Sequence, residues 1–176
     1  MFDSQISNRN FLLANGFKFV LQKYPKVDFF CSEANIPSIN LGIAVQSSYL
    51  KDIPIPGDKL TYEDLTLRFN VDEDLTNYLI VHKWLRGFGY PSNLNEYQQL
   101  LNEDANQPGV QNANSGQSDG SLIIYNSNYN ENVIVKFTGL FPVSLSTISF
   151  NAQVQNSEYV TAEVVFKYTL YDIIKL

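Results

Sequence analysis

Apolar and polar residues alternate with a period of two in several stretches of this sequence, and this pattern most constrains its fold. It is clearest in residues 17–21, 63–70, 133–138 and 159–171, where apolar side chains occupy every second position. A strand with one buried face shows this period, because successive side chains point to opposite faces of a sheet. Phe and Tyr, which pack well on a pleated surface, account for 12 and 11 of the 176 residues. The sequence therefore predicts a mostly β fold of the α+β class, an antiparallel β-sandwich or barrel.

Turn signals predict how some of these strands are connected. Tyr24-Pro25-Lys26 reads as a turn, since proline fixes φ and suits turn positions. It joins strands expected at residues 17–21 and 27–32, so we predict a β-hairpin there. Near the C-terminus we expect a strand at residues 147–154 and one long strand at residues 159–171.

A proline-rich segment interrupts the strand pattern in the first third of the chain. The apolar residues 42–49 are suited to pairing as a strand. Pro54 and Pro56 follow closely, and two prolines at this spacing exclude a helix and disfavour a central strand. We expect residues 51–58 to form an extended, exposed excursion.

Residues 72–88 change to the spacing of an amphipathic helix. Apolar positions recur every three or four residues, which places them on one helix face. These positions are Leu75, Tyr78, Leu79, His82 and Leu85. Asp72 or Asp74 is suited to capping the start, and Gly87 and Gly89 to ending the helix. We expect this segment to be the one main helix of the chain.

Residues 92–132 differ in character, because Asn, Gln, Ser and Gly dominate them. Such a composition is too polar to bury a core and predicts a long loop or insertion. Within it, residues 97–101 favour a short helical turn and residues 122–125 a short strand. We find no internal repeat, so residues 1–176 are interpreted as a single domain with a polar insertion at about 92–132.

The charge balance and the single cysteine exclude several classes of protein. The chain has 12 Lys and Arg against 18 Asp and Glu, a formal net charge of −6, without the clustered basic residues that grip nucleic acid. Cys31 is the only cysteine, so an intrachain disulfide is impossible and a reducing compartment is expected. The N-terminus does not resemble a secretion signal, and no apolar run is long enough to span a membrane. We expect synthesis in a cytoplasm and no membrane partner.

No constellation of residues predicts catalysis, a cofactor or a metal. His82 is the only histidine and lies on the apolar face of the expected helix, so we interpret it as structural. Cys31 lacks a base that would activate it and is interpreted as a small buried hydrophobe. Trp84 is interpreted as a packing residue. Phosphate-binding, dinucleotide-binding and nucleophile-elbow motifs are missing from the sequence. The chain is therefore predicted not to be an enzyme.

Surface chemistry favours self-association instead. Several strands carry residues of intermediate polarity on their second face, such as Thr161, Val165 and Thr169. A face of this kind is suited to being covered by a neighbour. Exposed strand edges invite association, and closing a sheet with copies of itself into a ring-shaped barrel removes them.

The order of the motifs resembles the tail tube proteins of contractile-tailed bacteriophages, and also the tube proteins of type VI secretion. Each motif is short, but together they cover most of the chain in the order of the family. The matching segments are Asn10-Phe11-Leu12, residues 31–37, residues 53–67, Asn70-Val71-Asp72-Glu73, and Lys136-Phe137-Thr138-Gly139-Leu140-Phe141-Pro142.

This resemblance implies a structural role in a virion tail. Such proteins form sixfold rings that stack into a tube inside a contractile sheath, and each subunit adds strands to a continuous inner barrel. The implied partners are copies of the chain itself, the tail sheath and the baseplate, while DNA passes through the lumen without specific binding. The resemblance also assigns contacts between rings to one loop. Its residues here are Tyr49, Leu50, Lys51, Asp52, Ile53, Pro54, Pro56, Gly57 and Asp58.

Two other functions remain open from the sequence. The polar insertion suits a tube-like protein at one end of the tail, in a baseplate hub, a tube-initiating complex or a terminal ring, since an end protein must contact unlike partners. The aromatic richness suits a β-barrel module that binds a small ligand or a glycan.

Overall fold

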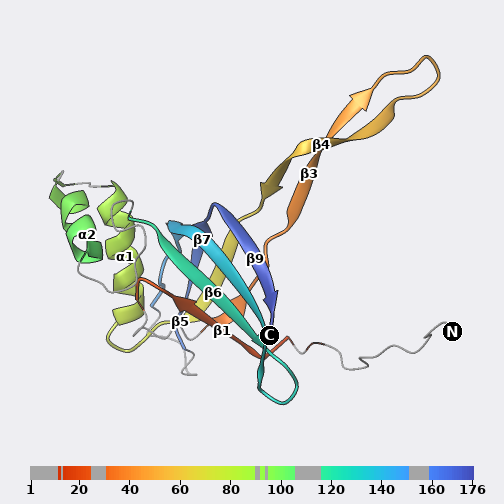
Figure 1. The fold of residues 1–176 in the computed structure, drawn as a ribbon. Helices are drawn as coiled ribbons and strands as arrows, with labels where there is room; N and C mark the ends of the chain where they lie inside the picture. The colour runs from red at the N-terminus through yellow and green to blue at the C-terminus, as the bar shows by residue number, and fades with distance from the viewer. Residues whose placement is uncertain are drawn as a thin grey trace.

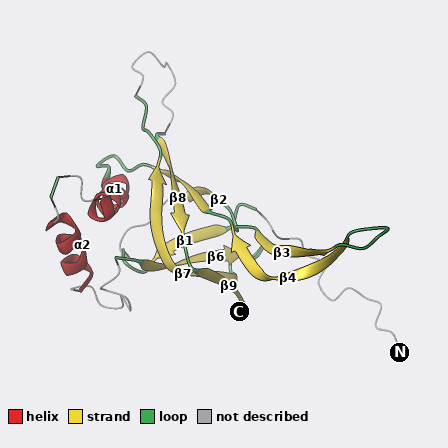
Figure 2. Ribbon diagram, turned by 90° about the horizontal axis from the view of Figure 1, so that it is seen from above, coloured by secondary structure: helices red, strands yellow, loops and turns green. Residues whose placement is uncertain are grey.

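The fold is a two-layered β structure with helices at one end and a long hairpin at the other (Figures 1 and 2). The computed structural model describes residues 12, 14–24, 31–89, 92–93, 95–105, 116–150 and 159–176. Within these residues it contains nine strands and two helices. They are β1 (Phe17–Leu21), β2 (Cys31–Ala34), β3 (Ile39–Gln46), β4 (Ile53–Tyr62), β5 (Leu65–Asn70), α1 (Thr76–Gly89), α2 (Asn95–Ala105), β6 (Ser118–Tyr125), β7 (Glu131–Leu145), β8 (Thr161–Lys167) and β9 (Leu170–Lys175).

One long strand joins the two layers. The main sheet has the order β1-β6-β7-β8-β5-β2, β9 pairs with β7 outside this path, and every pairing is antiparallel. The first part of β7 pairs with β6 and β9, whereas its last part, from Phe141, pairs with β8. Gly139 lies between the two parts with φ of +68°, a conformation that glycine adopts easily. The sheet therefore turns at this point and folds over itself.

The alternating stretches supply the core, as predicted. The buried side chains come from every second position of β1, β5, β7 and β8, so the apolar faces of both layers meet. The mostly β, antiparallel fold class is confirmed. The buried hydrophobic residues are Phe19, Leu21, Leu65, Leu67, Phe69, Val81, Trp84, Leu100, Leu122, Ile124, Val135, Phe137, Leu140, Ala162, Val164 and Phe166.

The strand pairings near both ends of the chain differ from the predicted ones. The hairpin predicted for residues 17–32 is wrong, because β1 pairs with β6 and β2 pairs with β5, at opposite ends of the strand order. Residues 25–30 of that hairpin lie outside the described residues. The predicted long strand at 159–171 is two strands, β8 and β9, since the chain passes from one layer to the other between them. Of the strand predicted at 147–154, residues 147–150 are not in a strand, and the rest lies outside the described residues.

Helix α1 matches the predicted helix at its C-terminal end but starts later. It begins at Thr76, after a turn closed by a 2.9 Å hydrogen bond from Leu75 N to Asp72 O. This turn separates Asp72 and Asp74 from the helix, so the predicted cap is wrong. Instead Asn77, which is buried, accepts a hydrogen bond from Asp72 N and donates one to Asn70 O.

The predicted polar loop holds more regular structure than expected: the helical turn predicted at 97–101 and the strand predicted at 122–125 are present, but the loop prediction is wrong for residues 95–96, 102–105 and 118–121. Helix α2 is a second helix, and it packs on α1 where Gly87 leaves room for Leu100. Strand β6 lies between β1 and β7 in the main sheet. Its inward positions include Ser118 and Gly120, and a Cβ on Gly120 would lie 3.1 Å from the Phe19 ring. The polar composition therefore conceals a central strand whose small residues accommodate a large neighbour.

Candidate assembly surface

The hairpin of β3 and β4 projects from the body on the side away from the helices (Figures 1 and 2). These strands form a separate two-stranded sheet. Their large apolar side chains are exposed, which is unusual for a run of this size and marks a surface of interaction. We call the following residues the hairpin patch: Ile39, Leu41, Ile43, Val45, Tyr49, Leu50, Ile53, Ile55 and Leu60.

Both faces of the hairpin are apolar. Cross-strand partners lie on the same face, so Ile43 with Pro56 belongs to one face and Ala44 with Ile55 to the other. An isolated two-stranded ribbon is marginally stable in water. At the tip, Tyr49 is 100% and Leu50 is 89% exposed. Covering the hairpin patch with another surface would therefore remove its apolar side chains from water and stabilise the hairpin.

Two glycines shape the middle of the hairpin. The register of β3 against β4 shifts at Gly42, between Leu41 and Ile43, which is typical of a β-bulge. A Cβ on Gly57 would lie 2.4 Å from the carbonyl oxygen of Gly42. The two backbones therefore approach each other more closely than any other residue type at position 57 permits.

The strand edges of the body offer a second surface. Within the described residues, β1, β2 and β9 each pair on one side only. Strand β9 and the residue after it expose Leu170, Ile173, Ile174 and Leu176. An apolar edge strand is suited to pairing with another chain.

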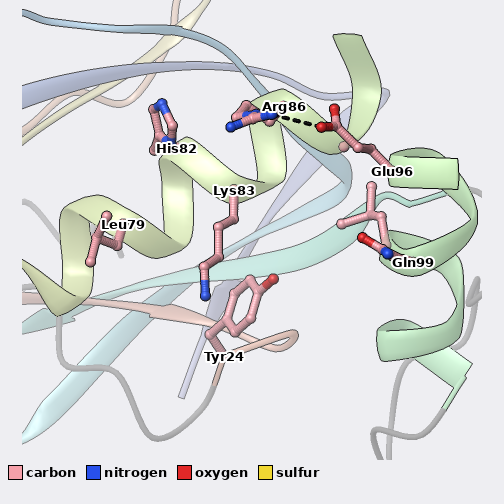
Figure 3. Close-up of a pocket in the computed structure, with 9 residues that line it drawn as sticks. Tyr24, Leu79, His82, Lys83, Arg86, Glu96 and Gln99 are labelled. Atoms are coloured by element: carbon pink, nitrogen blue, oxygen red, sulfur yellow. Dashed lines mark hydrogen bonds and ion pairs between the residues drawn. The ribbon is translucent and has the colours of Figure 1, made fainter. Parts of the chain in front are cut away.

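A cavity of about 400 Å³ lies between α1 and α2, beside Tyr24 (Figure 3). Lys83 points toward Tyr24, and Arg86 forms a 2.6 Å ion pair with Glu96. His82 also lines the cavity, but its side chain is exposed, so its predicted place on the apolar helix face is wrong. The buried face is set by Asn77, Val81, Trp84 and Gly87 instead.

The described residues do not assemble a reactive site. They contain no group of three or more His, Cys, Asp and Glu side chains that could hold a metal. Burial raises the pKa of the Cys31 thiol to about 12, so it stays neutral and packs against the core as a small hydrophobe. Trp84 is fully buried and donates a 2.7 Å hydrogen bond to Gly116 O, which confirms its packing role.

Comparison with known proteins decides the family. The family model described as phage tail tube protein matches residues 4–174. The chain belongs to the phage tail tube protein family. Its predicted resemblance is thereby confirmed, and family and fold are those of structural tube proteins, not enzymes. No curated protein sequence matches this tail tube protein.

Solved structures share the fold of this tail tube protein over nearly its whole length. A chain of the PVC extracellular contractile injection system, sheath-tube complex in the extended state, has a TM-score of 0.63 and 15% identity, covering 99% of this chain and 98% of that chain. A chain of the anti-feeding prophage tube terminating cap has a TM-score of 0.61 and 16% identity, covering 100% of each. A chain of the anti-feeding prophage baseplate has a TM-score of 0.56 and 11% identity, covering 98% and 97%. At these identities the likeness concerns the fold.

The structure brings the predicted ring-stacking residues of the tail tube protein together on one hairpin. Residues 49–52 form its tip, and residues 53–58 belong to β4. The expected excursion is exposed, but it is a paired strand, and Pro54 and Pro56 are tolerated because a two-stranded ribbon leaves backbone edges unpaired. Their role between rings remains a prediction.

Sequence reasoning missed the half of the hairpin patch that β3 supplies. Ile39, Leu41, Ile43 and Val45 alternate as in a strand with one buried face, and nothing in the pattern distinguishes a core from an interface with another chain. Among the described helices of the tail tube protein, none is long and apolar enough to cross a membrane.

Proposed function

We propose that this chain is a structural subunit of a contractile phage tail tube, in which sixfold rings stack to form the conduit for DNA ejection. The observation that carries the proposal is the hairpin patch, an exposed apolar surface on a member of the tail tube family. A monomer would leave this surface in water, where an almost fully exposed side chain such as Leu50 forgoes about 1.5–3 kcal/mol of burial and the half-exposed ones forgo less. Stacked copies cover it.

Ring closure and ring stacking use different surfaces in this proposal. The one-sided strands β2 and β9 join neighbours within a ring and so complete the sheet into a barrel. The hairpin joins one ring to the next through its tip and β4. The proposed stacking residues are Tyr49, Leu50, Lys51, Asp52, Ile53, Pro54, Pro56, Gly57 and Asp58.

The partners follow from the assembly. Similar folds occur in a sheath-tube complex and in a baseplate symmetrised sixfold, which supports a sheath and a baseplate as the partners of the tube. The net charge of −6 suits a lumen that lets DNA pass without binding it. The subunit is made in the host cytoplasm and resides in the virion tail. Residues 1–176 act as one tube-like domain, with the polar segment at about 92–132 as its insertion.

Electron microscopy of the purified protein tests this proposal. Hollow tubes or rings with sixfold symmetry are expected, at high protein concentration or after addition of baseplates. A protein that stays monomeric under all these conditions, baseplates included, overturns it.

A second candidate is a tube-like protein at one end of the tail, in the baseplate hub, the tube-initiating complex or a terminal ring. The fold is similar to a tube terminating cap, with a TM-score of 0.61, almost as closely as to the sheath-tube chain, with 0.63. This similarity supports an end protein nearly as well as a tube subunit. Counting copies per particle separates the two: many rings support the tube subunit, whereas one or a few rings support the end protein.

A further inference from the structure

Two tyrosine hydroxyls hold the two ends of the hairpin. Tyr171 Oη donates a 2.9 Å hydrogen bond to Pro37 O, just before β3 begins. Tyr168 Oη donates a 2.8 Å hydrogen bond to Glu63 O, immediately after β4 ends. Both tyrosines come from the segment that leads from β8 into β9. One part of the body therefore bonds both legs of the hairpin, meaning the residues just before β3 and just after β4.

The rings of these tyrosines continue the contact from the hairpin into the core. Tyr62, the last residue of β4, lies edge-on to both, with ring centroids 6.1 Å from Tyr168 and 5.7 Å from Tyr171. Phe137, which is 1% exposed, lies beneath them at 5.1 Å and 5.6 Å. Aromatic pairs at these separations add attraction beyond the area that they bury. We call Tyr62, Phe137, Tyr168 and Tyr171 the root cluster.

Backbone pairing fixes the direction of the hairpin only in part, because the ladder of β2 with β5 continues into the hairpin legs through single bonds, from Asn35 N to Thr66 O and from Glu63 N to Ser38 O. In the described part of the chain, β3 and β4 pair only with each other. An ion pair links Asp64 to Lys167 at the surface. Exposed ion pairs contribute little. The root cluster is therefore the aromatic side-chain contact that joins the hairpin to the body.

We propose that Tyr168 and Tyr171 are positioning residues, which fix the direction in which the hairpin leaves the body and so hold it ready to dock on a second copy of this chain. This inference rests on the proposed function of the hairpin in stacking. Strand β4 has ten residues, so at about 3.3 Å per residue it is a lever of about 33 Å. A rotation of about 10° at the root moves the tip by about 6 Å, which exceeds the reach of a side-chain contact.

The hydroxyl of Tyr168 is suited to this task over the whole ordinary pH range. Desolvation by burial raises its pKa to about 12, and the neighbouring Tyr171 and Asp64 raise it further in the same direction. Below that pH the hydroxyl stays protonated and remains a donor to Glu63 O.

The test removes both hydroxyls and keeps both rings, in the double variant Tyr168→Phe and Tyr171→Phe. Tyr159→Phe is the matched control, since Tyr159 is 89% exposed and lies outside the root cluster. Hydrogen exchange of the amides in β3 and β4, thermal unfolding of the monomer, and the critical concentration for tube formation are measured for each protein.

The double variant is expected to exchange its hairpin amides faster and to need more protein for assembly, by about fivefold per hydroxyl, the factor one neutral hydrogen bond is worth. Its unfolding temperature falls by about 2–4 °C per hydrogen bond lost, and Tyr159→Phe behaves as the wild type. If the hairpin amides of the double variant exchange at the wild-type rate, the positioning role is overturned. If they exchange faster but the critical concentration for tube formation is unchanged, the link between positioning and docking is overturned. If the wild type forms no tubes, the proposed function fails, whereas the exchange measurement still decides the positioning role.

Discussion

At the scale of single residues, position 57 of β4 requires glycine, because the backbone of Gly42 leaves no space for a Cβ there. Its missing side chain lets the backbone approach Gly42 where β4 bulges, since residues 57–59 lie opposite Gly42 alone. The obstacle to any Cβ is a backbone carbonyl, which cannot rotate away as a side chain would. Gly57 thus sets the shape of the hairpin, and any effect of its replacement on stacking passes through that shape.

Replacing Gly57 by Ala is expected to open the hairpin at the bulge. The added Cβ would meet Gly42 O at 2.4 Å, and relieving an overlap of this kind costs on the order of 1–3 kcal/mol. Hydrogen exchange of the β3 and β4 amides measures the opening, and it should accelerate while the unfolding temperature of the body stays unchanged. Gly89→Ala is the control, because a Cβ there meets nothing within 4 Å. Unchanged exchange in Gly57→Ala would contradict the close approach.

At the scale of elements, the hairpin tip is separable from the folded body. Gln46 and Ile53 are the last cross-strand pair, and residues 47–52 connect them. No buried core residue comes from this connection. Its two large side chains, Tyr49 and Leu50, are almost fully exposed, so the described part of the chain does not bury them.

Shortening the tip is expected to abolish stacking without unfolding the subunit. In the variant, Asn-Gly replaces residues 47–52, since a two-residue turn of this type fits an antiparallel pair. The monomer should unfold at the wild-type temperature, while sedimentation detects rings but no long tubes. The control leaves the hairpin intact and replaces Tyr129, which is 74% exposed in the turn between β6 and β7, by Asn. Normal tubes from the shortened protein would exclude the tip from the contact between rings.

The sequence predicts the faces of the strands better than their partners. In β5 and β8 the alternation identifies the buried side chains correctly, because one face of a sheet against a core is a local property. The pairing of β1 with β6 joins residues about a hundred positions apart and has no local signal. Residues 122–125 of β6 were predicted as a short strand, but its first half was missed because Ser118 and Gly120 occupy the inner face there, where the Phe19 ring needs space. For β3, the alternation is present but the covering surface lies outside the described chain.

At the scale of the whole molecule, apolar contact surfaces and net charge act in opposite directions on assembly. The hairpin patch and β9 both present exposed apolar side chains. The whole chain carries a net charge of −6, so that copies repel one another at neutral pH. Assembly occurs where apolar burial exceeds this repulsion.

Tube formation is therefore expected to increase with salt. Raising ionic strength from about 0.1 M to 1 M shortens the screening length from about 10 Å to 3 Å and so weakens the repulsion between acidic subunits. Sulfate additionally strengthens apolar burial, so it should promote tubes at lower concentration than chloride. Light scattering at fixed protein concentration measures the effect, and Ile43→Lys, which puts a charge into the hairpin patch, should respond far less. Tubes that dissolve in salt would instead mean that ion pairs hold the subunits together, and the hairpin patch would then not be the dominant contact.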